Sequence, residues 1–161
     1  MKILVFSDSH GNIESLRKAI SIHKSTTDLV IFLGDGVFDL ESIKNEFSDL
    51  AFYIVRGNCD FMCADIPKDG VLDLDGVRFL ICHGHTYNVK SSLDTVLYYA
   101  LEKEVDIVLF GHTHIPLDTV QQLNERTVRL FNPGSIGLNM AFGGINIVNG
   151  VAVTGHGTLN P

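Results

Sequence analysis

One apolar stretch decides the fold: Leu29-Val30-Ile31-Phe32-Leu33-Gly34-Asp35-Gly36, a run that stops at a carboxylate between two glycines. A continuous apolar run of this length is typical of a strand buried on both faces in a parallel or mixed sheet. Asp35 is then at the carboxyl end of the strand, where open α/β sheets bind their ligands. A buried strand needs no acid at its tip, so we expect Asp35 to belong to a functional site.

Two further strands with polar ends lie on either side of this stretch. The strands are expected at 2–7, 28–34 and 51–55, and they alternate with helices at 13–20 and 40–47. Asn12 is the expected N-cap of the first helix, because its side-chain oxygen can accept a hydrogen bond from a free backbone amide. The βαβαβ alternation predicts parallel strands joined by right-handed crossovers.

The second half of the chain has a different pattern. Asp75-Gly76 joins two β-like runs, which predicts a hairpin of strands 71–74 and 77–82. Ser91 or Ser92 is expected to cap a helix that ends near Lys103. The remaining strands are expected at 105–110, 118–122, 127–131, 144–148 and 151–155, with a tight turn at Asn149-Gly150. The last four are predicted to be antiparallel.

Together the two halves predict an α/β fold, a four-layer α/β/β/α sandwich with two facing mixed sheets. A length of 161 residues and a hydrophobic content of 45% are typical of one domain with a full core. We therefore expect a single domain over residues 1–161, with a metal site at the carboxyl ends of its strands.

Composition limits the compartment and the partners. No apolar run reaches the roughly 18 to 20 residues of a membrane span, and the first run is too short for a signal peptide, so a cytoplasmic location is expected. The odd cysteine count, Cys59, Cys63 and Cys82, predicts reduced thiols. A formal charge of −7 without a Lys/Arg cluster argues against nucleic acid as a partner, because nucleic-acid binders present a basic face.

Side chains of metal-ligand type follow five of the expected strands. In chain order they are Asp8, His10, Asp35, Asn58, His83, His112 and His114. Residues two apart in an extended segment point the same way, so Asp8 with His10, and His112 with His114, are expected to act as chelating pairs. Mixed oxygen and nitrogen ligands suit Mn, Fe, Ni, Co or Zn better than Mg or Ca.

The motifs that contain these ligands match a known family. They are Asp8-x-His10, Gly34-Asp35-Gly36, Gly57-Asn58-Cys59-Asp60, His83-Gly84-His85 and Gly111-His112-Thr113-His114. In this order they resemble the calcineurin-like metallophosphoesterases. The chain length and the Gly-Asn-Cys-Asp form resemble the small YfcE-type phosphodiesterase branch, as does Asn132-Pro133-Gly134-Ser135. Each motif alone is weakly specific, whereas the ordered set is highly specific.

The resemblance implies a cofactor and a reaction. It implies two divalent transition-metal ions, Mn first, held by two overlapping sets: Asp8, His10, Asp35 and His114; and Asp35, Asn58, His83 and His112. Asp35 bridges them. Two metals about 3.5 to 4 Å apart can hold a bridging hydroxide and clamp a phosphoryl group for in-line attack. The implied protein is a dinuclear metal-dependent phosphodiesterase acting on a small phosphodiester, and YfcE-type relatives form assemblies, which is compatible with a homo-oligomer.

Three residues beside the ligands have open roles. Asp60 is expected to orient His10 through a hydrogen bond, with a loop acid as the alternative. His85 is expected to support the ligands or contact substrate, with an ordinary polar loop residue as the alternative. Cys59 replaces a histidine that the wider superfamily uses to protonate the leaving oxygen or stabilise the transition state. Three roles are open for Cys59: a weak metal ligand, a nucleophile or, as we favour, a small residue beside the site. Losing a general acid costs roughly 10² to 10⁴ in rate, which favours activated aryl diesters.

Two other functions share the fold or the chemistry. The alternative is a non-catalytic or weakly catalytic metal-binding scaffold, because one relative, a retromer subunit of eukaryotic trafficking, is mainly an interaction surface. A nuclease shares the chemistry but requires a basic track that this sequence lacks. All seven ligand positions are intact, which favours metal binding; intact ligands alone do not establish turnover.

Overall fold

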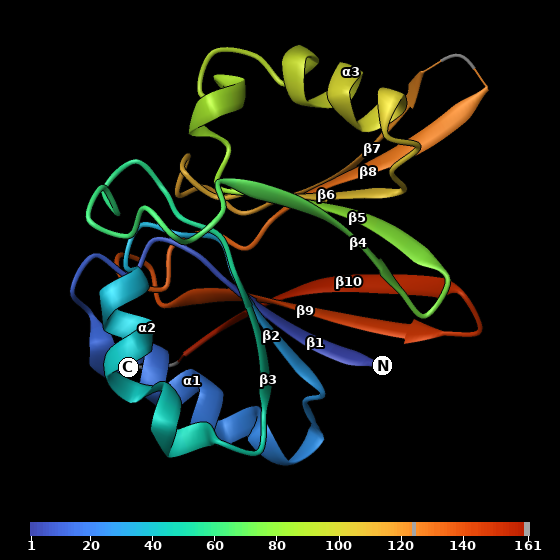
Figure 1. The fold of residues 1–161 in the computed structure, drawn as a ribbon. Helices are drawn as coiled ribbons and strands as arrows, with labels where there is room; N and C mark the ends of the chain where they lie inside the picture. Colours follow the sequence, from blue (N-terminus) through green and yellow to red (C-terminus); the bar gives the residue numbers. More distant parts are fainter. Residues whose placement is uncertain (124, 160–161) are drawn as a thin grey trace.

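The computed structural model describes residues 1–123 and 125–159, which form two facing five-stranded sheets (Figure 1). The first sheet has the order β10-β9-β1-β2-β3. Its strands are β1 (Lys2–Phe6), β2 (Leu29–Phe32), β3 (Ala51–Ile54), β9 (Ala141–Val148) and β10 (Val151–Thr158). The second sheet has the order β4-β5-β6-β8-β7. Its strands are β4 (Asp69–Leu74), β5 (Val77–Cys82), β6 (Ile107–Leu109), β7 (Leu117–Leu123) and β8 (Arg126–Asn132).

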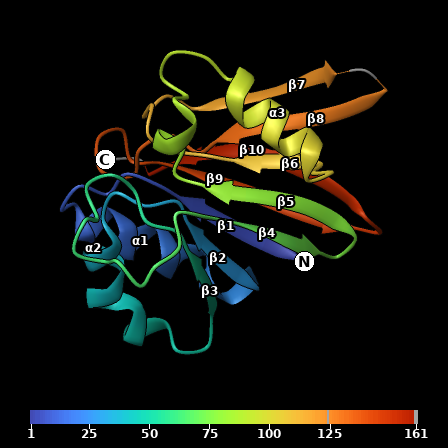
Figure 2. The ribbon, with the colours of Figure 1, turned by 45° about the horizontal axis from the view of Figure 1, so that its top comes forward.

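Helices cover the outer faces of both sheets (Figures 1 and 2). The α-helices are α1 (Ile13–His23), α2 (Val37–Ile43) and α3 (Asp94–Glu102). Short 3₁₀ segments are η1 (Lys24–Thr26), η2 (Lys44–Phe47) and η3 (His85–Tyr87). Helices α1 and α2 lie against the first sheet and α3 lies against the second. The predicted four-layer α/β/β/α order is confirmed.

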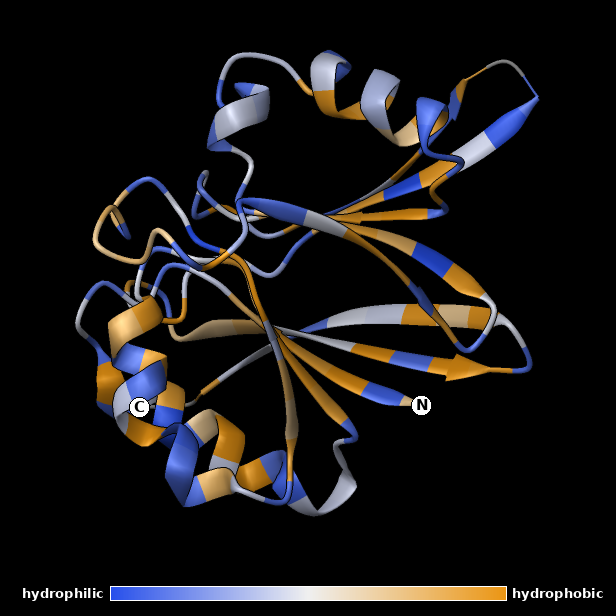
Figure 3. Cartoon of the chain, viewed as in Figure 1, coloured by the Kyte–Doolittle hydropathy of each residue, from blue (hydrophilic) through white to orange (hydrophobic). Residues whose placement is uncertain are grey.

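Alternation along each strand produces three separate cores. In β1, Ile3 and Val5 pack between the sheets, whereas Leu4 and Phe6 pack under the helices. In β5, Phe79 belongs to the core between the sheets and Leu80 to the core under α3. Because successive side chains point to opposite faces, a strand covered on both sides has to be apolar throughout. Figure 3 shows the result as mainly orange strands in the centre of the molecule.

Strand pairing agrees with the predicted pattern. β1, β2 and β3 are parallel neighbours, and β4 and β5 form an antiparallel hairpin around Asp75-Gly76. β9 and β10 are antiparallel across the Asn149-Gly150 turn. β8, predicted only as an antiparallel strand, pairs in that sense with β7 and also joins β6 in parallel. Both sheets are therefore mixed.

The two predicted helix caps have different outcomes. Asn12 is the N-cap of α1, and its side chain accepts a hydrogen bond from the Ser15 amide at 3.1 Å. The cap predicted at Ser91 or Ser92 is wrong, because α3 begins at Asp94 with Leu93 at the cap position. The Ser92 hydroxyl still accepts from the Asp94 amide at 3.1 Å, so it satisfies one donor of the first turn from just outside the helix.

The loops that carry the candidate ligands gather at one end of the sandwich. They follow the carboxyl ends of β1, β2, β3, β5 and β6, and Figures 1 and 2 both show them on the side opposite the amino terminus. This placement follows from parallel pairing within each sheet. Among the described residues, no helix is long and apolar enough to cross a membrane.

Candidate metal centre

Most candidate ligands have a left-handed backbone. The φ angle is +57° at Asp8, +44° at His10, +56° at Asp35, +65° at His112 and +62° at His114. The prediction of extended chelating pairs is therefore wrong: Asp8 and His10 do converge, but on a left-handed backbone, whereas the ligand atoms of His112 and His114 fall in separate clusters. Left-handed residues other than glycine are uncommon and concentrate at functional sites. Here they turn the chain sharply at the strand ends.

The first ligand group combines Asp8, His10 and His114, whose ligand atoms all lie within 4.8 Å of one another. Asp8 Oδ1 is 3.1 Å from His114 Nε2 and 3.6 Å from His10 Nε2. The two Nε2 atoms are themselves 3.3 Å apart. A pair of imidazole nitrogens directed at one carboxylate oxygen is a typical arrangement for a transition-metal cation.

The second ligand group combines Asp35, His83 and His112, again within 4.8 Å. His83 is fully buried, and its Nδ1 lies 2.8 Å from the carbonyl oxygen of Leu33. A neutral imidazole that donates from Nδ1 has its lone pair on Nε2, which here is 3.3 Å from Asp35 Oδ2. The β2 strand thus orients the ring of His83 as well as supplying Asp35.

Asp35 lies between the two groups. Besides its place in the second group, it lies within 4.8 Å of His10 in a third cluster that also contains Cys59. Its Oδ1 accepts a hydrogen bond from the Cys59 amide at 2.7 Å, while Oδ2 faces His83. Asn58 is exposed in the same loop, and its side-chain amide donates to Cys59 Sγ at 3.4 Å.

Two buried atoms show that these residues suit a cation. Asp8 Oδ1 and His83 Nε2 are both buried, and neither has a hydrogen-bond partner. A buried polar atom without a hydrogen-bond partner costs free energy. A cation held by the first group would satisfy Asp8 Oδ1, and one held by the second would satisfy His83 Nε2. The donor set of carboxylate oxygens and imidazole nitrogens matches divalent transition metals.

The charges of the carboxylates and imidazoles are coupled. Burial works against ionisation of Asp35, but the hydrogen bond and charge of His83 outweigh it and hold the pKa of Asp35 below its usual range. Burial likewise opposes a charged His83, yet Asp35 and Asp8 raise the pKa of His83. Burial and the nearby His83 lower the pKa of His112 to about 4, so the second group already contains one neutral imidazole near pH 7, as coordination requires.

Asp60 positions Asp35 rather than His10. Its carboxylate accepts from four backbone amides, with donor–acceptor distances of 2.6 to 2.9 Å: those of Asp35, Gly36, Val37 and Gly57. These bonds use both of its oxygens, so the predicted hydrogen bond to His10 is not the contact that Asp60 makes. The side chain instead ties the loop after β3 to the first turn of α2.

Two glycines allow the loops after β2 and β3 to meet. Gly34 has φ +96°, and a Cβ on it would lie 2.3 Å from the Gly57 backbone nitrogen. A Cβ on Gly57 would lie 2.1 Å from Asp35 Oδ1. Both distances are far below van der Waals contact, so the position of the Asp35 carboxylate requires glycine at both places.

Sequence reasoning missed supporting roles of Ser7, Ser9 and Asp39, and it named Ser135 only as part of a motif. The Ser7 hydroxyl donates to Asp8 Oδ2 at 2.6 Å, and the Ser135 hydroxyl donates to the Asp8 carbonyl at 2.7 Å. Asp39 accepts from the Ser9 hydroxyl and the Gly11 amide. The only signal for these roles is proximity to the motifs, since serine and aspartate are common in ordinary turns.

The Asn132-Pro133-Gly134-Ser135 motif supports one of the loops that carry candidate ligands. Asn132 is buried, and its side-chain amide donates to the Gly111 carbonyl at 2.8 Å and to the Thr113 hydroxyl at 3.1 Å. These bonds fix the loop that carries His112 and His114. The motif therefore acts on the ligands through their backbone.

His85 and Cys59 lie at the edge of the ligand groups. The His85 ring is centred 5.4 Å from that of His83 and 6.2 Å from that of His112, and it is partly exposed, as a substrate contact requires. Burial and His83 lower the pKa of His85. Burial and the Asp35 carboxylate raise the pKa of Cys59 to about 11, so the thiol is protonated near neutral pH and is a poor nucleophile.

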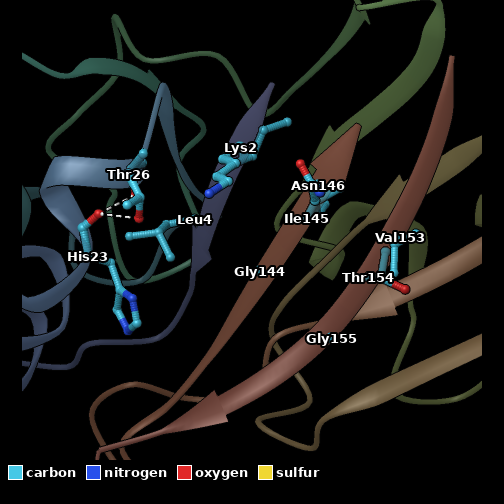
Figure 4. Close-up of a pocket in the computed structure, with 12 residues that line it drawn as sticks. Lys2, Leu4, His23, Thr26, Gly144, Ile145, Asn146, Val153, Thr154 and Gly155 are labelled. Atoms are coloured by element: carbon cyan, nitrogen blue, oxygen red, sulfur yellow. Dashed lines mark hydrogen bonds between the residues drawn. The ribbon is translucent and has the colours of Figure 1, made fainter. Parts of the chain in front are cut away.

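A separate hollow of about 340 Å³ lies on the outer face of the first sheet (Figure 4). Figure 4 shows it between the end of α1, where His23 is located, and strands β9 and β10. Among the described lining residues there is one histidine and no carboxylate. This hollow lacks the ligands for a metal ion, so the chemistry is concentrated at the strand ends.

Comparison with known proteins gives one consistent family. Residues 1–148 match the model of the calcineurin-like phosphoesterase superfamily domain. A probable metallophosphoesterase of Bacillus subtilis, YsnB, is 36% identical over 138 residues, which cover 86% of this chain and 76% of that protein. Phosphodiesterase MJ0936 of Methanocaldococcus jannaschii is 34% identical over 131 residues, covering 71% of this chain and 74% of that protein.

A solved structure supports the same fold. It is that of a predicted phosphoesterase from Streptococcus pneumoniae, with a TM-score of 0.77, 24% identity, and coverage of 98% of this chain and 88% of that one. At that identity the likeness shows the fold alone. Its near-complete coverage means that both sheets and the helices on their outer faces are shared.

Proposed function

The chain belongs to the calcineurin-like phosphoesterase superfamily and is a metal-dependent phosphoesterase, and we propose that it hydrolyses small phosphodiesters at a centre for two divalent metal ions. The first position would be held by Asp8, His10, Asp35 and His114. The second would be held by Asp35, Asn58, His83 and His112. When bound, such a pair neutralises phosphoryl oxygens and lowers the pKa of water.

The overlap of the ligand clusters at Asp35 is the observation that carries this proposal. Asp35 lies within 4.8 Å of His10, from the first group, and of His83 and His112, from the second. A single carboxylate within reach of both groups can serve two cations at the short separation that dinuclear hydrolysis needs. Four hydrogen bonds to Asp60 fix the backbone around Asp35, and the Cys59 amide donates to the Asp35 carboxylate itself.

The residues of this chain also account for a preference for diesters. Asp8 and Asp35 offset part of the charge of two divalent ions, so a singly charged diester suits the centre better than a fully ionised monoester. Cys59 stands where the wider superfamily has a histidine that can protonate the leaving oxygen, and its thiol keeps its proton near neutral pH. The absence of a general acid favours leaving groups that depart unprotonated. The name phosphodiesterase, borne by the Methanocaldococcus relative, agrees with this preference.

Basic residues outside the motifs add a limited positive field. Arg56 and Lys68 lie close enough to His85 to lower its pKa, after the larger effects of burial and His83. Lys90 acts in the same direction on His112. Lys68 and Lys90 are exposed, so they are available to attract an anionic substrate to the second ligand group.

The test is addition of Mn²⁺ to metal-stripped protein with bis(p-nitrophenyl) phosphate, with Asp35→Ala run beside it. Hydrolysis by the wild type and its loss in the variant are the expected results. Equal rates in both proteins would reject the site. Metal binding without hydrolysis of any diester would instead favour the scaffold function. Repeating the assay with Ni²⁺, Fe²⁺, Co²⁺ and Zn²⁺ ranks the metals.

A further inference from the structure

A cavity of about 180 Å³ opens beside the first ligand group. Two candidate ligands, His10 and Asp35, line one part of it, and Phe38, Asp39 and Cys59 line another. We call the surface formed by Phe38 and Cys59 the Phe38 wall. The cavity is smaller than the roughly 300 to 1,000 Å³ of a site for a drug-sized ligand, so it suits one arm of a substrate.

Phe38 presents an exposed ring on an anchored backbone. The residue is 62% exposed, although it is in the first turn of α2. On one side, the Val37 amide donates to Asp60 at 2.9 Å; on the other, Asp39 accepts from the Ser9 hydroxyl at 2.6 Å. Both contacts lead to loops that carry ligands. The ring is therefore preorganised beside the metal centre, where a bound apolar group would remove it from water.

Two further exposed apolar residues follow Asp60, which also lines the cavity. They are Phe61 and Met62, which are 76% and 70% exposed. In Figure 3 the loop between β3 and β4 contains an orange stretch on the same side of the molecule as the first turn of α2. A methionine beside aromatic rings adapts its shape to flat ligands. Exposed apolar residues gathered at a catalytic opening are typical of a ligand-binding surface.

Charge excludes an anionic occupant from this part of the cavity. The Asp39 carboxylate lines it, so a second phosphate or a carboxylate on the substrate would meet like charge. The phosphoryl group belongs on the ligand side of the cavity, and the group that reaches Phe38 has to be neutral.

We propose that the Phe38 wall binds a neutral aromatic ester group of the substrate, so that the centre selects aromatic phosphodiesters by direct contact. This inference rests on the proposed phosphodiesterase function and adds the chemical class of the substituent. Stacking of an aromatic group on Phe38 is expected to tighten binding about two- to tenfold. The effect is separate from leaving-group activation, because it acts on binding.

The test compares methyl(phenyl)phosphinate with dimethylphosphinate, each titrated by calorimetry into the Mn²⁺-loaded protein. Both probes carry a single negative charge, as a phosphodiester does, and have carbon–phosphorus bonds in place of esters, so binding is measured without turnover. The wild type is expected to prefer methyl(phenyl)phosphinate about two- to tenfold. Phe38→Ala and the milder Phe38→Leu should lose this preference with little change for dimethylphosphinate, whereas Phe38→Tyr should keep it. Tyr98→Ala is the matched control, because Tyr98 is a similarly exposed aromatic residue, 68% exposed, on α3.

Several outcomes would overturn the inference. An unchanged phenyl preference in Phe38→Ala and Phe38→Leu would do so, as would failure of the wild type to bind either phosphinate. A change in sedimentation of Phe38→Ala with the preference unchanged would assign the wall to contact between copies of the chain. If the preference depends on Phe38 but no diester is hydrolysed, the proposed function fails and the aromatic contact stands.

Discussion

The two ligand groups lie in different surroundings. In the second group the side chains of His83 and Asp35 are 0% and 3% exposed, whereas in the first group those of His10 and His114 are 32% and 29% exposed. Left-handed backbone occurs in both groups, so it does not distinguish them. The difference is that the buried His83 ring is held by the Leu33 carbonyl and faces Asp35, whereas the His10 and His114 rings are partly open to solvent. The comparison indicates that the second group is held more rigidly than the first.

Loss of the shared carboxylate should have the largest effect. Asp35→Ala removes a ligand from both groups, so both metal ions and the hydrolytic activity should be lost, by more than about 100-fold, since even indirect partners of ligands are worth about 10- to 100-fold. Asn58→Ala is the control and should weaken mainly one ion. Metal content measured by mass spectrometry distinguishes them; the same single-ion loss in both variants would exclude the bridging role.

Displacement of that carboxylate should have the next largest effect. In Gly57→Ala the new Cβ would lie 2.1 Å from Asp35 Oδ1, so the carboxylate has to move and metal affinity should fall about 10- to 100-fold. Gly155→Ala is the matched control, because a Cβ there meets nothing within 4 Å. Titration of metal-free protein with Mn²⁺ measures the change. Equal affinities in the two variants would contradict the close packing between the loops.

The contrast in burial predicts a contrast in stability. In metal-free protein, His83→Ala leaves Asp35 buried without its partner and should lower the free energy of unfolding by about 3 to 5 kcal/mol. His114→Ala removes a more exposed partner of Asp8 and should cost less than about 1 kcal/mol. Urea unfolding in the presence of a chelator measures both. Similar losses would mean that the two groups are equally rigid.

The smallest expected change is a gain of activity at the edge of the two groups. Cys59→His places an imidazole where the wider superfamily has one, so hydrolysis of diesters with poor alkyl leaving groups should rise, well below the roughly 10²- to 10⁴-fold effect of an optimised general acid. Aryl diesters should change little, because their leaving groups need no proton. Paired rate measurements on the two substrate classes provide the test, with Cys59→Ser as the control. An equal rise for both classes would point to another cause.

Much of the fold could be predicted because local patterns agree with the tertiary structure. The apolar run at 29–33, the cap at Asn12 and the turn at Asp75-Gly76 each depend on a few neighbouring residues. The start of α3 could not be predicted in the same way, because Ser91 and Ser92 are both good caps and the helix begins where its apolar face meets the second sheet. Packing therefore started the helix after both of the caps that the local sequence offered.

The ligand positions were visible in the sequence, but their backbone geometry was not. Extended backbone was expected for Asp8 with His10 and for His112 with His114, and all four residues are left-handed. This conformation is imposed by distant contacts, such as the His112 amide with Asp8 Oδ2 and the Gly137 amide with the Asp8 carbonyl. Aspartate and histidine adopt the left-handed region more readily than most residues, but it is still their minority conformation, so contacts between the assembled loops select it.

Parallel pairing places strand ends along one edge of a sheet, so the strand pattern predicts that the ligands after β1, β2 and β3 lie near one another, and likewise those after β5 and β6. It also predicts oxygen and nitrogen ligands suited to transition metals. Tertiary packing fixes how the edges of the two sheets meet, how Asp60 holds the backbone of Asp35, and the exposure of Phe38 beside the ligands. These features depend on contacts between residues far apart in the chain, such as Asp60 with Asp35, which no local pattern predicts.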